Sequence, residues 1–322
     1  MYRWSVAWLL SVLVVLSWGP AMAQADPQAT ELPGATQLQD VEVRANSLQA
    51  RAESFIASVG SPIAGRKLAV WSGTICVGAA GLRPDASRLV VDRILDWGHS
   101  LGIRTGSPDC RPNILIVFAD DGDAMAKQLV RARRLDFNAG VSGSQRGNRA
   151  LRDFENSGRP VRWWPVSIPV DPDSGLPIVR TRGQAPFTSV PNITRPSDLG
   201  AFGQITMASR LYDDTLDAMQ SMVIVVDRSA LERADLAQLA DYLSMVALAQ
   251  IEPDTRPTAP SILTLFDDED LAPASLSVWD RAFLQALYGT HQRNVSAQAD
   301  SDLIARSLAR ELAKIDAGEV SP

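Results

Sequence analysis

Histidine is nearly absent from this sequence, which has only His99 and His291 in 322 residues. A catalytic zinc site takes three protein ligands and leaves one position for water, and two histidines cannot build a three-histidine site. The two cysteines match neither a zinc motif nor a C-x-x-C redox motif. We therefore expect no bound metal and no cofactor.

Runs of basic residues and nucleotide-binding motifs are also missing. The formal net charge is −6, and the arginines are scattered along the chain. A nucleic-acid binder needs a basic face that neutralises phosphates, so this balance argues against nucleic acid as a partner. No G-x-G-x-x-G, P-loop or G-x-S-x-G sequence is present.

The N-terminal 23 residues have the pattern of a signal peptide. Arg3 precedes an apolar run, Val6–Leu16, and Ala21-Met22-Ala23 fits the small-x-small cleavage rule. An uncleaved anchor is the alternative, but the run is short for a membrane span. We expect a periplasmic or secreted protein with no integral membrane segment after cleavage.

Cys76 and Cys110 are the only cysteines. An even cysteine count in an exported chain predicts a disulfide, here between Cys76 and Cys110. The alternative is a pair of buried free thiols.

Composition and hydrophobic periodicity divide the rest of the chain. We expect a flexible leader at residues 24–46, rich in Gln, Ala, Pro and Thr, and a single globular domain at residues 47–316. Within that domain, residues 47–227 have an α/β pattern and residues 228–316 are mainly helical. Residues 317–322 are a tail.

The N-terminal half alternates apolar strands with amphipathic helices, which predicts an α/β layered unit. Helices are expected at Ser47–Val59, Asp85–Leu101 and Asp120–Arg134, with a closing helix at Asp300–Asp316. Strands are expected at Val41–Val43, Lys67–Cys76, Ile114–Phe118, Trp163–Ile168 and Met222–Val226, with Trp163–Ile168 at a sheet edge because of Pro165. Loops are expected at Gly78–Gly81, Leu135–Arg149 and Asp171–Pro196.

The most informative helix is predicted over Ala234–Gln250. Its apolar residues recur at i, i+3, i+4 and i+7, from Leu236 and Leu239 to Val246, with no interrupting Gly or Pro. The apolar run Met222–Val226 precedes this helix. A proline-bracketed turn, an acidic loop, a Leu276-Ser277 start and a final helix ending in Leu287-Tyr288-Gly289 follow it.

This order resembles the catalytic half of metzincin metalloproteases, the matrixin branch above all. In that family the helix carries H-E-x-x-H-x-x-G-x-x-H, a Met-containing turn lies under the metal, and a closing helix ends in L-Y-G. The three ligand positions fall here on Ala240, Ser244 and Gln250. The general-base position falls on Asp241, and the Met-turn position on Ile262 or Leu263.

The resemblance implies an α/β (α+β) fold: a metzincin-like mixed sheet packed on helices, with a helical C-terminal part. It also implies a zinc site without its ligands. Alanine has no donor atom, and without zinc no water acquires a pKa near 7. The mature chain also resembles exported proteobacterial proteins of unknown function, through stretches such as Ile75–Leu82 and Pro160–Trp164.

We therefore expect a non-catalytic, exported, metalloprotease-like protein that binds a peptide or protein partner in the envelope, rather than an enzyme. The candidate cleft residues are Tyr212, Ala240, Asp241, Tyr242, Ser244 and Gln250. Two alternatives stay open: a hydrolase that uses non-metal chemistry through Asp241 and Ser244, which lie three apart on one helix, and a structural component of envelope assembly.

Overall fold

The computed structural model describes residues 33–134, 137, 146–172, 175, 177, 215–268, 270–290 and 295–318. The chain divides into two compact units, Met1–Glu42 and Val43–Pro322. The segment expected to be a signal peptide, together with Tyr212, His291 and most of Asp171–Pro196, lies outside the described residues. The second unit contains the β-sheet.

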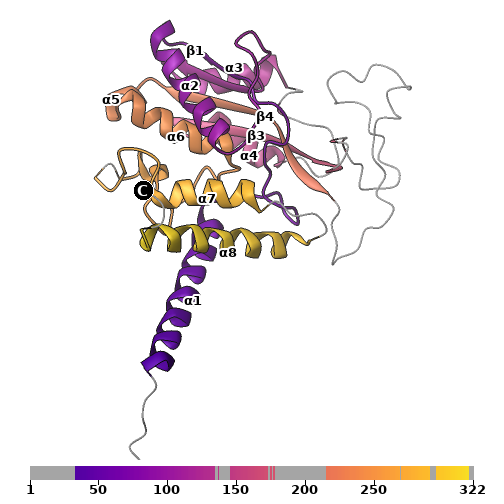
Figure 1. Ribbon diagram of the computed structural model, residues 1–322. Coiled ribbons are helices and arrows are strands. Elements are labelled where there is room, and N and C mark those ends of the chain that lie inside the picture. The colour runs from indigo at the N-terminus through magenta and orange to yellow at the C-terminus, as the bar shows by residue number, and fades with distance from the viewer. Residues whose placement is uncertain are drawn as a thin grey trace, which may run out of the picture. The chain divides into compact units, whose positions relative to one another are not determined.

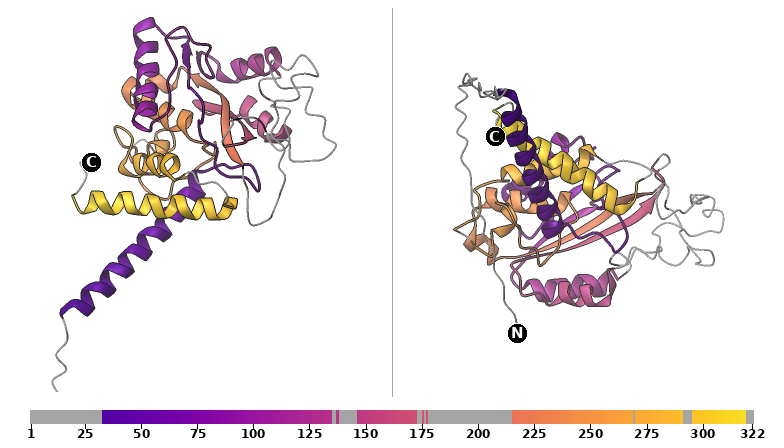
Figure 2. Two further views of the ribbon diagram at one scale, coloured as in Figure 1. Left: turned by 45° about the vertical axis from the view of Figure 1, so that its right-hand side comes forward. Right: turned by 90° about the horizontal axis from the view of Figure 1, so that it is seen from below.

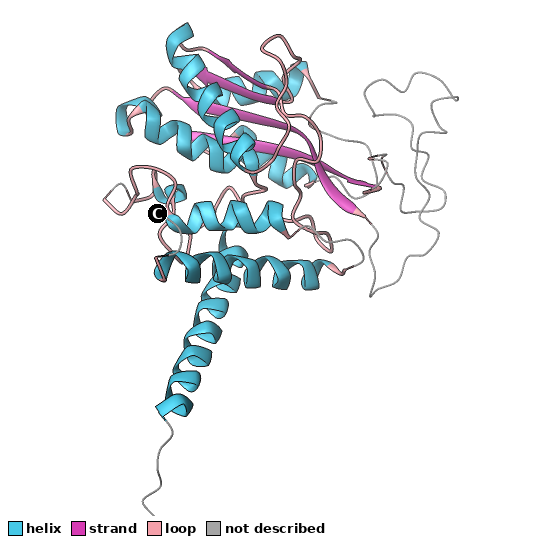
Figure 3. Ribbon diagram, viewed as in Figure 1, coloured by secondary structure: helices cyan, strands magenta, loops and turns pink. Residues whose placement is uncertain are grey.

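A four-stranded mixed sheet forms the centre of this unit (Figure 1 and Figure 3). The strands are β1 (Val77–Ala80), β2 (Ile114–Ala119), β3 (Val161–Val170) and β4 (Leu216–Asp227), in the spatial order β1-β2-β4-β3. Strands β1, β2 and β4 are parallel, and β3 pairs antiparallel with β4 at the edge. The mixed α/β fold class predicted from the sequence is confirmed.

The two faces of the sheet carry alternate residues of the same strands, as the pleat requires. Ile114, Ile116 and Phe118 of β2 join the main core, whereas Val223 and Val225 of β4 join a second, smaller cluster. On β3, Trp163 belongs to the first core and Trp164 to the second. The sheet is therefore buried on both faces, which explains its nearly continuous apolar strands.

Helices cover both faces. Helices α2 (Pro84–Ser100) and α6 (Leu236–Leu248) pack against each other on the main-core side. Helices α3 (Gly122–Ala132) and α4 (Gly147–Glu155) cover the opposite face, as Figure 2 shows from below. The short helix α5 (Ala230–Arg233) precedes α6.

The C-terminal part is helical, as expected. Helices α7 (Val278–Gly289) and α8 (Ala297–Asp316) pack side by side beneath the main core (Figure 1). The last turns of α1 (Pro33–Val59) join them, because the Phe55 ring lies 5.4 Å from that of Trp279 and 5.9 Å from that of Phe283, centroid to centroid. A 3₁₀ turn, η2 (Ile262–Thr264), links α6 to α7.

Several helix boundaries follow from capping groups that are visible in the sequence. The Asp121 side chain accepts a hydrogen bond from Ala124 N–H at the start of α3, and Pro84 occupies the first turn of α2. Ser277 and Asp280 form a reciprocal capping box at the start of α7. The expected helices in these three regions are confirmed.

Other expectations are corrected. Helix α1 begins at Pro33, so Val41–Val43 is helical rather than a strand and Ser47 is not an N-cap. Gly78–Gly81, expected as a loop, supplies most of β1. Leu68–Trp71 is buried but is no ladder strand, since its pairing is an isolated bridge from Val70 to Ala218. In the last two cases the sheet partner, absent from the local sequence, decides between strand and coil.

Two further expectations fail at the surface. Helix α4 begins at Gly147, inside the stretch Leu135–Arg149 that its Gly and Ser content marks as a flexible connection. Leu89, whose apolar side chain and place in the expected amphipathic helix Asp85–Leu101 favour burial, is 42% exposed. Among the described residues, no helix is long and apolar enough to cross a membrane.

A disulfide joins Cys76 to Cys110 with a Cα–Cα distance of 6.0 Å, which confirms the pairing over two free thiols. It links the residue before β1 to the segment before β2. Such a bond is typical of chains that fold in an oxidising compartment.

Replacing both cysteines, Cys76→Ser with Cys110→Ser, is expected to lower the free energy of unfolding. The bond closes a loop of sequence separation 34, and the chain-entropy model gives a loss of about 4 kcal/mol. Urea denaturation followed by circular dichroism measures the loss. Equal midpoints for the double variant and the oxidised wild type would contradict the stabilising role.

Candidate functional site

Helix α6, where the ligand positions of a metalloprotease were expected, is buried on every side. Asp235 caps it by accepting a hydrogen bond from Gln238 N–H, and every residue from Leu239 to Leu248 is buried. A helix buried all round has no face to offer to an open cleft. The structure therefore places the candidate cleft residues Ala240, Asp241, Tyr242, Ser244 and Gln250 in the core, none more than 4% exposed.

Asp241, which the resemblance places at the general-base position, joins α6 to α2. Its Oδ1 accepts from Arg93 Nε at 2.6 Å and from Trp97 Nε1 at 2.9 Å, and its Oδ2 accepts from Arg93 Nη2 at 2.8 Å. The hydrogen bond to Asp241 raises the pKa of the Arg93 guanidinium. A carboxylate that accepts three hydrogen bonds from a bidentate guanidinium and an indole is a structural anchor.

Ser244 and Gln250 also direct their polar atoms to the protein itself. Ser244 Oγ donates to the Ala240 carbonyl at 2.7 Å, within the helix. Gln250 Oε1 accepts from Ala69 N–H at 3.0 Å and holds the extended segment before β1. The hydrogen bonds of Asp241 go to Arg93 and Trp97, and that of Ser244 goes to Ala240, so the two side chains are not bonded to each other.

Tyr242 faces aromatic neighbours rather than a cleft. Its ring packs edge-on against Trp163, with centroids 6.3 Å apart, and against Phe266, with centroids 5.2 Å apart. Burial raises the pKa of the Tyr242 phenol. Its role in the described structure is packing between the sheet and the turn that follows α6.

Tyr288, from the Leu-Tyr-Gly ending, completes the C-terminus of α6. Its hydroxyl donates to the Leu248 carbonyl at 2.6 Å and accepts from Trp71 N–H at 3.3 Å. Trp71 Nε1 donates to the Ala247 carbonyl at 2.8 Å. Helix C-termini leave carbonyls without partners in the helix, so the Leu-Tyr-Gly motif has a clear structural use here.

The turn at Ile262 and Leu263, where a Met-turn was expected, is fixed by a buried carboxylate. Ile262 and Leu263 are buried, and Asp280 accepts hydrogen bonds from Ser261 Oγ at 2.5 Å and from Ile262 N–H at 2.8 Å. Burial raises the pKa of Asp280, and these hydrogen bonds oppose that rise. The turn is thus tied to the first residues of α7.

The structure describes no group of three His, Cys, Asp or Glu side chains arranged to hold a metal ion within its described ranges. His99 is exposed in the last turn of α2. The structure has one pocket beside α4 and another beside the start of α8, and the candidate cleft residues line neither of them.

A small pocket of about 80 Å³ lies between α4, the start of β3 and the loop after α6. We call it the arginine pocket, because Arg146, Arg159 and Arg162 line it. Its other lining residues are Ala150, Asp153, Phe154, Ser157, Trp163, Trp164, Glu252, Pro253 and Asp254. With three acidic side chains beside three arginines, the lining has no net charge.

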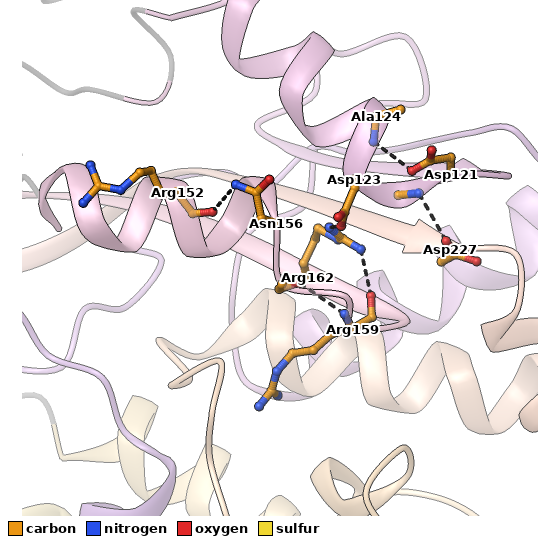
Figure 4. A network of polar contacts seen from close by, with 10 residues as sticks. Asp121, Asp123, Ala124, Arg152, Asn156, Arg159, Arg162 and Asp227 are labelled. Atoms are coloured by element: carbon orange, nitrogen blue, oxygen red, sulfur yellow. Dashed lines mark hydrogen bonds and ion pairs between the residues drawn. The ribbon is translucent and has the colours of Figure 1, made fainter.

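The three arginines are positioned by their own chain. Arg162 pairs with Asp123 at the start of α3 and donates to the Arg159 carbonyl at 3.0 Å (Figure 4). Arg159 pairs with Asp254, and Arg146 Nη2 donates to Ser61 Oγ at 2.8 Å. The close approach of Arg162 requires glycine at position 122, where a Cβ would lie 2.9 Å from Arg162 Nη2.

Two donors of these arginines stay unused. Within the part of the chain that the structure describes, Arg146 Nη1 and Arg162 Nε are buried and have no hydrogen-bond partner. Burial lowers the pKa of the Arg146 guanidinium. Unmade hydrogen bonds of buried donors are unfavourable, so both groups are suited to an acceptor oxygen supplied from outside.

Asp300 is a second unsatisfied group. It lies in the first turns of α8 and is 1% exposed, and neither carboxylate oxygen has a hydrogen-bond partner among the described residues. Burial raises its pKa to about 6; Lys67 opposes this rise and Asp217 adds to it. It lines a pocket of about 200 Å³ with Ile56, Arg66 and Leu68.

Comparison of the chain with protein-family models, with curated proteins and with solved structures found no match. A function is therefore inferred from the fold and the side-chain chemistry.

The arginine pocket and Asp300 were not predicted from the sequence, although each left a signal. Asp300 stands four, eight and twelve residues before Ile304, Leu308 and Leu312, the apolar face of α8, which predicts a buried carboxylate. Arg162 interrupts the apolar strand Val161–Val170. Arg146 gave no comparable signal, because its partners come from distant segments.

The variant Asp241→Asn is expected to lower the free energy of unfolding by about 2–4 kcal/mol, because it removes a buried charge partner of Arg93. Asp92→Asn is the control, because Asp92 is exposed and lies next to Arg93 on α2. It should change the free energy of unfolding by less than about 0.5 kcal/mol. Thermal and urea denaturation compare the two. Equal stabilities would show that the Asp241 contacts contribute nothing.

Asp300→Asn is expected to stabilise the protein at neutral pH. The folded-state pKa of Asp300, about 6, lies above the ordinary aspartate value of 3.8, so the folded state binds the proton more tightly. Wild-type stability should therefore rise as the pH falls from about 7 to 4, and at pH 7 the ionised carboxylate is unfavourable by about 1–3 kcal/mol. Urea denaturation across that range should show this slope in the wild type and a smaller slope in Asp300→Asn.

Proposed function

We propose that this chain is an exported, non-catalytic binding protein with a metzincin-like core, acting in the periplasm or outside the cell on a peptide or protein partner. The observation that carries the proposal is the state of α6. The positions that correspond to the zinc ligands and the general base are Ala240, Ser244, Gln250 and Asp241, all buried and, where polar, bound to their own chain. These side chains are therefore not available to react with a substrate, which supports a non-catalytic role.

The arginine pocket is the favoured contact with the partner. Arg146 Nη1 and Arg162 Nε are unsatisfied donors, and a peptide supplies acceptor oxygens as main-chain carbonyls or as carboxylates. The lining is balanced in charge, which suits a carbonyl-rich segment better than a free multivalent anion. A volume of about 80 Å³ accepts one such group, not a whole chain.

The place of the pocket on the sheet supports a peptide. Asp227 N–H donates to the Pro160 carbonyl at 2.7 Å, so in an antiparallel ladder the next residue, Val161, directs its main-chain groups away from β4. Trp163, which lines the pocket, also directs its main-chain N–H and C=O away from β4. An extended segment anchored in the pocket would meet these groups and add hydrogen bonds of the β-augmentation type.

Two prolines restrict this contact to the start of β3 (Val161–Val170). Pro165 and Pro169 have no N–H to donate, so further main-chain pairing along the strand is interrupted. The proposed binding mode is therefore one anchored group and a short stretch of main chain, in place of a strand-long grip. Affinity in the micromolar range is typical of so small a contact.

Panning of a random peptide library on the purified protein, followed by fluorescence polarisation with recovered peptides, tests the proposal. We expect Arg146→Met to weaken binding at least about tenfold, because it removes an unsatisfied donor. Arg152→Met, an exposed change on the same helix outside the pocket, is the matched control and should bind like the wild type. No recovered peptide, or equal binding by both variants, would count against the pocket.

A further inference from the structure

The pocket that contains Asp300 is separate from the arginine pocket, and the two share no lining residue. We call it the Asp300 pocket. It lies where the last turns of α1, the segment 60–68 and the start of α8 meet, and its volume is about 200 Å³. Its walls are mainly apolar, formed by Ile56, Leu68 and Ile304, and Ala57 stands exposed at its rim.

The polar side of this pocket is incomplete. Asp300 presents two carboxylate oxygens, both buried and both without a hydrogen-bond partner among the described residues. The nearby charged groups have their own contacts: Arg66 pairs with Asp217, and Lys67 Nζ donates to the Thr215 carbonyl at 3.2 Å. A buried carboxylate without donors is costly, and its raised pKa reflects that cost.

Chemistry narrows what the pocket can take. A hard divalent cation needs several oxygen ligands, and no group of three acidic, histidine or cysteine side chains stands together in the described ranges. An anion would be repelled by Asp300. A purely apolar ligand would contact the apolar walls but leave the Asp300 carboxylate without a hydrogen-bond donor. The remaining class has a cationic donor at one end and a hydrocarbon body at the other.

We propose that the Asp300 pocket is a binding site for a primary ammonium group carried on a short aliphatic chain. The ammonium would donate to the two oxygens of Asp300, and the alkyl chain would lie against Ile56, Leu68 and Ile304. Charge-assisted hydrogen bonds of this kind are about twice as strong as neutral ones. The inference does not rest on the proposed function, since it concerns a different pocket and a different ligand.

Water is the competing occupant. A water molecule takes up about 30 Å³ in the liquid, so the pocket has room for several, and these could hydrate Asp300 in place of an amine. The two cases differ in charge dependence: an ammonium site discriminates strongly between butylammonium and n-butanol, and a hydrated pocket does not.

The test is isothermal titration calorimetry of the purified protein with butylammonium chloride at about pH 8, where Asp300 is ionised. We expect saturable binding with one site per chain, and binding of n-butanol at least about tenfold weaker. Asp300→Asn should weaken butylammonium binding by a similar factor. Asp302→Asn, on the same helix but outside the pocket, should leave it unchanged.

A second variant separates the site from the stability of the fold. Ala57→Leu adds bulk at the exposed rim and keeps Asp300, so it should weaken butylammonium binding at least about tenfold without changing the melting temperature. Absence of saturation up to about 10 mM butylammonium, or equal affinity in the Asp300→Asn protein, would show that the pocket holds water only and would overturn the proposal.

Discussion

The structure depends on one constraint: α6 is buried on every side, so each polar group on it needs a partner from the same chain. Asp241 finds Arg93 and Trp97 on α2, Ser244 bonds back to Ala240, and Gln250 reaches the Ala69 amide. Tyr288 and Trp71 satisfy the last carbonyls of the helix. These bonds hold α2, α7 and the segment before β1 around α6, and they use the polar atoms that a cleft would have offered to a substrate.

The same rule identifies the places where the fold is not self-sufficient. Most buried polar groups in folded proteins are hydrogen-bonded, so the exceptions call for an explanation. Here the exceptions among the described residues are Arg146, Arg162 and Asp300, and each lines a pocket. One donor atom of each of these arginines lacks an acceptor and the aspartate lacks donors, so the two pockets differ in the chemistry that would complete them. Groups that destabilise a fold are commonly tolerated where they bind something.

Local sequence was sufficient wherever pattern and caps agreed. Helix α2 starts at Pro84, α3 at the cap Asp121 and α7 at the Ser277–Asp280 box, and the β-branched run at Ile114 is a central parallel strand. It failed at Gly78–Gly81, whose small residues become a strand only because β2 lies beside them. It failed again at Leu68–Trp71, where only Val70 bridges to β4, and the amides of Ala69 and Trp71 bond to the side chains of Gln250 and Tyr288.

By itself the sequence determined the mixed α/β class, the helical C-terminal part, the disulfide, and the lack of histidine ligands at positions 240, 244 and 250. These follow from periodicity, cysteine count and residue identity, which need no knowledge of distant contacts. Only the tertiary structure decided that the Asp241 carboxylate is held by Arg93 and Trp97, and that Arg146 Nη1 and both carboxylate oxygens of Asp300 are buried without hydrogen-bond partners. Whether a polar group is satisfied depends on residues far away in the sequence, as Arg93 and Asp241 show by a separation of 148.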